Sequence, residues 1–300
     1  MDRFEQFRRA ATDRGLPADD IARFADQLRF AVWARIALDG EDVVGQFGGL
    51  PRLPVGARWP SSEDGSPLPF LASVDCTALP QAEGLALPEA GSLLFFLHHE
   101  HDLLAPLTAD EPEYARVVHV PAGTETAPAS PPASHDSRTF FHEDIPFLLA
   151  ERPLSASVEP VLPRWVGDED FDFDSAVLEE LAAELEHTGE LCEVADELWP
   201  EPDRSAWLRL GGYCSRIGGQ DPPWTRMTLA GITSTHDGGL ADPGRFGPGD
   251  VEEYRLTREW LPLAQFYTGS DYHYGCFLIS SDDLEAKQFD RMRSFTMFTE

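Results

Sequence analysis

The sequence predicts an α+β fold in which β-rich units are flanked by short helices. Helical apolar spacing marks the first 30 residues and the stretch 173–198, whereas short apolar runs bounded by Gly and Pro mark most of the rest. A similar order of motifs also occurs twice along the chain. We therefore expect duplicated β-rich units with antiparallel or mixed sheets, an N-terminal helical hairpin and acidic helices packed on the outside.

Residues 1–30 are expected to form the helical hairpin. Phe4, Phe7 and Ala11 recur at helical spacing, and the Gly15 to Pro17 segment then breaks the pattern. A second stripe runs from Ile21 to Leu28 at i, i+3, i+4 and i+7. The stripe predicts a hairpin that packs on the main body, although a helix that binds a partner has the same pattern.

A first β-rich half is expected over residues 31–150. Strands are predicted at 30–38, 68–76, 91–97 and 114–120. Residues 47–60 are too rich in Pro and Gly for a regular helix or a central strand, and they are expected to be extended and rich in turns. Alternation over 68–76 predicts one face made of Phe70, Ala72, Val74 and Cys76. The unbroken apolar run Leu93 to Leu97 predicts a strand that is covered on both faces. Residues 121–138 are expected to form a mobile surface loop or a boundary between halves.

A second half is expected over residues 151–300, in one compact body with the first. Between Trp165 and Asp203 the chain has 15 acidic residues and no Lys or Arg, yet leucines repeat at helical spacing. This pattern predicts two amphipathic helices with acidic outer faces. Strands are predicted at 208–210, 261–267, 275–280 and 294–299, with a long loop at 236–250. A helix between the last two strands is predicted to open with a capping box at Asp282 and Glu285.

The charge of the chain limits its partners. The formal net charge is −30, from 53 acidic and 23 basic side chains, which repels phosphate backbones and anionic lipid. We therefore expect no nucleic-acid or membrane partner, and a basic protein as the favoured kind of partner. Four scattered cysteines, no secretory signal and no long apolar run predict a cytoplasmic protein with reduced thiols.

Several motifs in a defined order resemble the YwqG-like family of uncharacterised bacterial proteins. They are Gly48-Gly49-Leu50-Pro51 with Trp59-Pro60, the strand Leu68 to Asp75, the strand Gly91 to Phe96, Gly211-Gly212-Tyr213, and Leu261 to Gln265. The resemblance covers about residues 45–300. It implies a compact α+β fold with a duplicated β-rich unit, and it implies no settled activity.

Three positions depart from the pattern of that family. Cys214 stands where the family has Pro after Gly-Gly-Tyr, and Phe266-Tyr267-Thr268 stands where the Gln strand leads to Asp. His273-Tyr274-Gly275 replaces a Trp-Gly-Asp element. A family site at these positions would be altered in this protein.

A histidine-rich segment follows the apolar strand 91–97. In extended backbone His99 and His101 share one face, and His98 and Glu100 share the other. Imidazole and carboxylate groups suit zinc, iron or nickel, so these four residues are candidate ligands of a metal-dependent enzyme. The alternative is a solvated polar loop.

Arginines flank the two Gly-Gly segments. Arg52 and Arg58 follow Gly48 and Gly49, whereas Arg209 and Arg216 surround Gly211 and Gly212. The glycines fit no phosphate-loop or dinucleotide pattern, and they suit tight turns and close backbone approach. These eight residues are nevertheless candidates for a small anionic-ligand site between the halves, because pockets favour such interfaces.

The acidic helices are the candidate surface for a partner. We expect the contacts with a basic protein to come from Glu179, Glu180, Glu184 and Glu186. No catalytic motif of high specificity occurs, and no motif requires a cofactor. The sequence therefore favours a non-catalytic binding protein with an acidic surface, for which an immunity protein that neutralises a toxin is a physical example. The alternatives are the anionic-ligand binder and the metal-dependent enzyme.

Overall fold

The protein is α+β, and one large antiparallel sheet dominates it. The computed structural model describes residues 2–99, 102, 113–133, 147–166, 176–200, 202, 205–214, 223, 227, 248–267 and 273–298. The strands of the large sheet are β1 (Arg29–Ile36), β2 (Gly45–Phe47), β4 (Phe70–Asp75), β5 (Ser92–Leu97), β6 (Ala115–Val120), β8 (Arg152–Val161), β9 (Leu208–Gly211), β10 (Trp260–Tyr267), β11 (His273–Ser280) and β12 (Arg293–Phe298).

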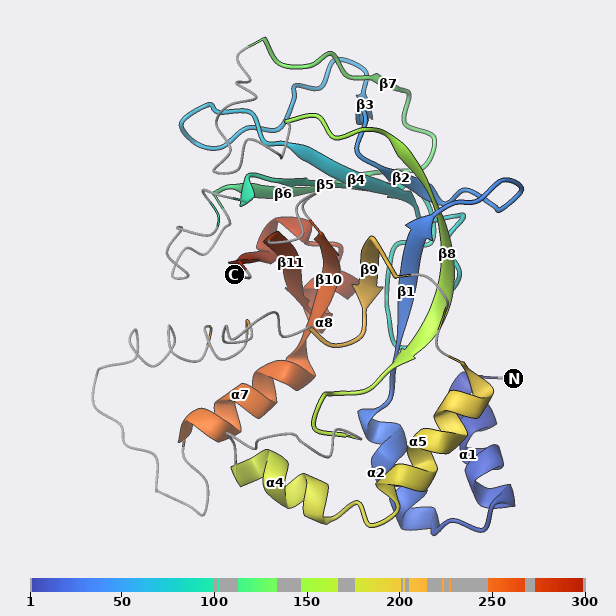
Figure 1. The fold of residues 1–300 in the computed structure, drawn as a ribbon. Helices are drawn as coiled ribbons and strands as arrows, with labels where there is room; N and C mark the ends of the chain where they lie inside the picture. The colour runs from blue at the N-terminus through green and yellow to red at the C-terminus, as the bar shows by residue number, and fades with distance from the viewer. Residues whose placement is uncertain are drawn as a thin grey trace.

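The large sheet curls into a nearly closed barrel (Figure 1). Its ten strands lie in the order β12-β11-β10-β9-β1-β8-β2-β4-β5-β6, and every neighbouring pair is antiparallel. Strands from both halves of the chain therefore share one sheet, with β1 and β8 side by side at its centre. Curling brings the faces of β5 and β11 together, since the rings of Phe95 and Phe277 lie 5.9 Å apart.

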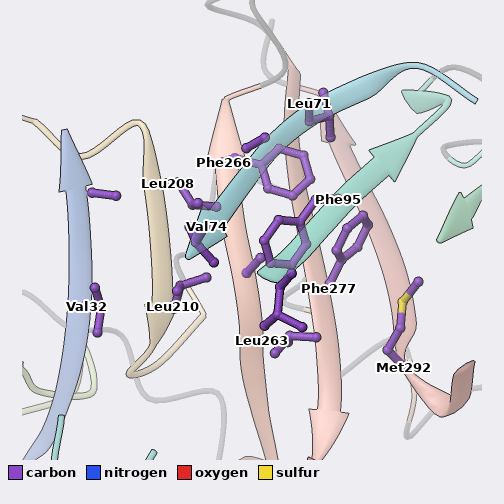
Figure 2. Close-up of a cluster of buried hydrophobic side chains, with 14 of the residues drawn as sticks. Val32, Leu71, Val74, Phe95, Leu208, Leu210, Leu263, Phe266, Phe277 and Met292 are labelled. Carbon is purple, nitrogen blue, oxygen red and sulfur yellow. The ribbon is translucent and has the colours of Figure 1, made fainter. Parts of the chain in front are cut away.

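The inside of the barrel forms the main hydrophobic core. Side chains that alternate along each strand point inward, including Val32, Leu210, Phe95, Phe266 and Phe277 (Figure 2). Phe266 and Phe277 pack edge to face with their ring centroids 5.2 Å apart. Alternate residues of the same strands face outward, and some of them, such as Phe96 and Leu278, pack against other elements.

Helices cover one end of the barrel (Figure 1). They are α1 (Arg3–Asp13), α2 (Ala18–Gln27) and α5 (Thr188–Leu198), and they share one apolar cluster with Phe30 at the start of β1. The Asp2 side chain accepts the Phe4 N–H at 2.8 Å and caps α1. Phe7 and Phe24 stack at 5.2 Å within the hairpin, and Phe4 packs edge to face on Phe30 of β1 at 5.2 Å, so the N-terminal hairpin packs on the body as its stripe predicts.

Additional elements cover the outer faces of the sheet. The short strands β3 (Arg52–Pro54) and β7 (Thr126–Pro128) pair with each other, and Leu53 of β3 packs with β4 and β5 residues. Helix α7 (Pro248–Glu259) places Leu256 against β11 residues. The remaining described helices are α4 (Ala176–Ala183), α8 (Ser281–Glu285) and the 3₁₀ turn η1 (Phe289–Arg291). Among the described residues, no helix has the length and apolar content that crossing a membrane requires.

The structure corrects the expected facing of residues 68–76. A β-bulge between Phe70 and Ala72 interrupts the register with β5. Phe70 therefore joins the outer cluster, whereas Leu71 joins Ala72 and Val74 in the barrel core. Simple alternation fails here because the bulge inserts one extra residue into the strand.

Three further expectations change. Residues 126–128, expected in a loop, form β7 because they pair with β3. Helix α7 begins at Pro248, inside the segment expected to be a loop up to residue 250. The N-cap of α8 is Ser280, whose hydroxyl accepts the Asp283 N–H at 3.1 Å, so the box predicted to open at Asp282 begins two residues too late.

Candidate functional site

Polar side chains form a row across the outer face of the second half of the sheet. The strand registers place Trp33 opposite Ser157 and Arg209, Arg209 opposite Gln265, and Gln265 opposite Cys276. Since Val32, Leu208, Leu210, Phe266 and Phe277 point into the barrel, these residues point away from it. We call Ser157, Trp33, Arg209, Gln265 and Cys276 the outer polar row.

A hydrogen-bond network joins the outer polar row to the turn after β9. Arg209 donates to Gln265 Oε1 and to the Tyr213 carbonyl, both at 3.0 Å. Gln265 Nε2 donates to the same carbonyl at 3.0 Å, and the Tyr274 hydroxyl donates to Gln265 Oε1 at 3.2 Å. Gln265 is only 1% exposed, so both ends of its amide are satisfied within the protein. The network fixes the backbone of residues 211–213.

The turn after β9 is shaped by its two glycines. Gly211 and Gly212 have φ values of 81° and 77°, in the left-handed region that favours glycine. A Cβ at Gly211 would lie 3.0 Å from Leu85, and one at Gly212 would lie 3.0 Å from Val161. These glycines therefore allow tight turning and close packing. The Gly212 carbonyl accepts a hydrogen bond from Arg29 at 3.2 Å.

A small pocket lies beside this turn. Its volume is about 280 Å³, including the part that opens to solvent. The turn and the start of β1 supply its polar wall, while α7, β10 and β11 supply most of its apolar wall. The lining residues are Arg29, Tyr213, Cys214, Met227, Leu256, Thr257, Trp260, Pro262 and Leu278.

Arg29 is the main charged group of the pocket. Its guanidinium donates to the carbonyls of Gly212 and Thr257, at 3.2 and 2.6 Å, and lies 4.1 Å from the centre of the Tyr213 ring. Within the described part of the chain Arg29 makes no ion pair, whereas Arg35 and Arg3 pair with Glu159 and Glu83, each at 2.7 Å. Among the described residues, Arg29 is thus a partly buried cation without a carboxylate partner.

Burial lowers the pKa of Arg29, and the charge of Arg258 acts in the same direction. Tyr213 and Cys214 oppose this lowering. The direction means that the charged form of Arg29 is less well solvated than a free guanidinium. In a chain of net charge −30, the described lining of the pocket therefore carries a positive charge, that of Arg29.

Two cysteines lie next to the pocket. The sulfur atoms of Cys214 and Cys276 are 3.3 Å apart, and both residues are buried. Burial raises the pKa of Cys276 well above its ordinary value, so this residue is a neutral thiol. The remaining cysteines, Cys76 and Cys192, lie in other parts of the fold.

The arginines predicted as one ligand site lie in different places. Arg209 belongs to the outer polar row. Arg52 lies in β3 of the separate two-stranded sheet, where it is exposed and donates to the Thr126 carbonyl at 3.0 Å. Arg58 is exposed in the segment after β3, and Arg216 lies outside the described residues. Of the three that the structure describes, only Arg209 belongs to the network beside the pocket.

The first Gly-Gly segment has the geometry of a packed turn. Gly48 and Gly49 have φ values of 67° and 74°. A Cβ at Gly49 would lie 2.6 Å from a carboxylate oxygen of Glu151. A carboxylate at this distance disfavours a bound anion, so the first segment lacks the charge environment of the second.

The histidine-rich segment lies partly in the described structure. His98 and His99 are 5% and 2% exposed, so they are buried and not solvated. Asp102 is also buried and accepts hydrogen bonds from the Ser294 and Thr296 hydroxyls of β12, the second at 2.8 Å. Glu100 and His101 lie outside the described residues. The metal site stays a prediction, and the described residues contain no cluster of three or more His, Cys, Asp or Glu arranged to hold a metal.

The predicted partner-binding glutamates lie on and after α4. Glu179, Glu184 and Glu186 are exposed, and Glu180 is partly exposed. Basic side chains of the N-terminal hairpin offset part of this acidic surface, since Arg23 lies 3.8 Å from Glu184. Arg14 likewise pairs with Glu193 and Glu197 of α5.

Sequence patterns did not identify Arg29 or Tyr213 as site residues. Arg29 has no motif around it, and it reaches the pocket only because β1 pairs with β9. Tyr213 and Gln265 could be picked out from the sequence, because both lie in motifs that resemble the YwqG-like family. Only the tertiary structure shows that the Gln265 side chain donates a hydrogen bond to the Tyr213 carbonyl.

Comparison with known proteins gives a family and no activity. No curated protein matches the chain. A family model described as "Domain of unknown function (DUF1963)" matches residues 45–296. This match covers most of the 300 residues, and the chain therefore belongs to the DUF1963 family.

Proposed function

We propose that the protein is a non-catalytic binding protein that holds a small anion in the pocket beside Arg29. The observation that carries this proposal is the partly buried Arg29 guanidinium, which within the described structure has carbonyl and aromatic partners and no carboxylate. Taking a charge out of water is unfavourable unless an opposite charge is paired with it. A bound anion supplies that pair.

The surroundings of Arg29 favour an anion over a neutral ligand. Arg258 adds a second positive charge near the guanidinium. Arg293 lies 5.5 Å from the ring of Trp260, which lines the pocket. Guanidinium donors match the oxygens of phosphate, sulfate and carboxylate groups.

Replacing Arg29 by alanine is expected to raise the Kd for the preferred anion at least about tenfold. A hydrogen bond to a charged group contributes about 1.5–3 kcal/mol, and 1.4 kcal/mol is about tenfold in affinity. Isothermal titration with inorganic phosphate, sulfate and acetate measures this effect.

Arg52→Ala is the matched control, because it removes one exposed arginine far from the pocket lining. Arg258→Ala removes the charge of an exposed side chain and keeps Arg29. It therefore replaces Arg29→Ala as the test of the proposal if that variant unfolds. The absence of binding of all three anions by the unmodified protein, or equal weakening in Arg52→Ala, contradicts the proposal.

We propose as a second candidate function that the acidic helices bind a basic protein, as an immunity protein binds a toxin. Its support is that Glu179, Glu184 and Glu186 are exposed around α4 and that α5 exposes Glu190, Glu193, Asp196 and Glu197. Complementary charge steers such partners and sets their orientation.

Reversing Glu179, Glu184 and Glu186 to lysine is expected to reduce capture of a basic partner from a lysate by about tenfold or more at physiological salt. The control reverses Asp39, Glu89 and Glu125, which are equally exposed acids elsewhere. Both variants change the net charge by the same amount, so a general charge effect lowers capture equally. Equal capture by the two variants contradicts a specific acidic docking surface.

We also propose that the two halves arose by internal duplication and that the chain belongs with the YwqG-like proteins. The strand order is symmetric about the β1–β8 pair, and β2 and β9 both end in a Gly-Gly turn. Both β4 and β10 contain a bulge against the next strand. The motif order that resembles the YwqG-like proteins supports the second proposal.

A further inference from the structure

The Cys214–Cys276 pair combines close sulfur atoms with unequal access to solvent. The sulfurs lie 3.3 Å apart, close to the S–S bond length of about 2.05 Å in a disulfide. Cys276 is 0% exposed on β11, whereas Cys214 is 6% exposed and lines the pocket. A reagent that enters the pocket therefore meets Cys214 first.

The positions of the two cysteines relative to the pocket favour reaction at Cys214. Cys214 lines the pocket together with Arg29, whereas Cys276 does not line it and is 0% exposed. Cys276 stays a thiol because burial raises its pKa, and it can supply a proton after the first step.

The structure of the pocket limits the size of the reagent. Cys214 lines the pocket and is only 6% exposed, so a reagent must be small to reach its sulfur. Hydrogen peroxide is close to water in size, whereas glutathione disulfide and similar molecules are far larger. The oxidant that fits is therefore a small hydroperoxide.

We propose that Cys214 and Cys276 form a dithiol site that one molecule of hydrogen peroxide oxidises to a disulfide, in a single stoichiometric reaction. The Cys214 thiolate attacks one oxygen of hydrogen peroxide, the O–O bond breaks, and the leaving hydroxide takes a proton to form water. The Cys276 sulfur then attacks the Cys214 sulfenic acid, an S–S bond forms, and the S–O bond breaks. The departing hydroxide takes the Cys276 proton as a second water, so two thiols and one peroxide give one disulfide and two waters.

This site is independent of anion binding, although the two share the wall formed by Tyr213 and Cys214. A disulfide would join the turn after β9 to β11 across β10. Failure of phosphate, sulfate and acetate to bind leaves the dithiol proposal unchanged. Failure of the disulfide to form leaves anion binding unchanged.

Peptide mapping of the unmodified protein after treatment with hydrogen peroxide tests the proposal. Trypsin cuts after Arg209, Arg216, Arg258 and Lys287, so the expected product is residues 210–216 linked to residues 259–287 under non-reducing conditions. The link should be lost on reduction. This measurement needs no variant, so it does not depend on the folding of a mutant.

Single replacements separate the attack on peroxide by Cys214 from the closure of the disulfide by Cys276. In Cys276→Ser, a dimedone adduct is expected on Cys214, because no second thiol resolves the sulfenic acid. In Cys214→Ser, neither the link nor an adduct on Cys276 is expected. Cys76→Ser and Cys192→Ser are matched controls that remove one thiol each, and both should form the link as fast as the unmodified protein.

Two results overturn the proposal. One is peroxide oxidation of Cys192 or Cys76 at least as fast as the loss of the Cys214 thiol. Burial raises the pKa of each of these control thiols to about 11, so they are expected to react more slowly. The other is a Cys214 thiol that stays intact while the protein remains folded in excess peroxide.

Discussion

Phe95→Ala is expected to lower the free energy of unfolding by about 3–5 kcal/mol, the range for replacing a buried Phe by Ala. Phe95 is 0% exposed in the barrel core and its ring lies 5.9 Å from that of Phe277 (Figure 2). The residue joins β5 to β11 across the barrel, so the cavity would open between strands of the two halves. Urea unfolding followed by circular dichroism measures the change.

The matched control for Phe95→Ala is Val55→Ala, which also shortens an apolar side chain. Val55 is 62% exposed, and surface replacements change stability by about 0.5 kcal/mol or less. A loss below about 1 kcal/mol in Phe95→Ala, similar to that of Val55→Ala, contradicts a barrel core that contains residues of both halves.

Gly48→Ala is expected to destabilise the protein by about 3 kcal/mol or more. The φ of Gly48 is 67°, and the left-handed conformation costs a residue with a Cβ about 1–2 kcal/mol. The new Cβ would also lie 2.5 Å from the Ala150 carbonyl oxygen and 2.9 Å from Leu149 Cβ. Crowding against fixed backbone adds about 1–3 kcal/mol.

Gly56→Ala separates the two contributions to this loss. Gly56 has a similar φ of 83°, but a Cβ there has no atom within 4 Å. Its replacement should therefore show only the conformational part, about 1–2 kcal/mol. Equal losses in the two variants, measured by urea unfolding, would mean that the turn after β2 is not packed against residues 149–151.

Local patterns were sufficient for elements whose residues repeat at one clear period. The stripes of α1 and α2 gave the N-terminal hairpin, and the leucine repeats gave α4 and α5. The apolar run of β5 correctly predicted a strand covered on both faces, because Phe95 faces the barrel and Phe96 faces the outer cluster. In each case burial follows from spacing alone.

The central strand β8 was not predicted. Its sequence, Arg152 to Val161, contains Pro153, Pro160, two serines and a glutamate, which are weak strand formers. It forms a strand because β1 pairs along eight of its residues and β2 pairs at its start. Pairing between segments more than a hundred residues apart leaves no local signal.

The candidate site shows the same division. Sequence alone determined the acidic charge, the α+β class, most strands and the motif residues Gly211 to Tyr213 and Gln265. Only the tertiary structure decided that Arg209 and Gln265 both donate to the Tyr213 carbonyl. It also decided that Arg29 lacks a carboxylate partner among the described residues. The same holds for the Cys214 and Cys276 sulfurs, which lie 3.3 Å apart. The physical reason is that composition and periodicity record how each segment is buried, whereas a site depends on which distant segments the sheet places side by side.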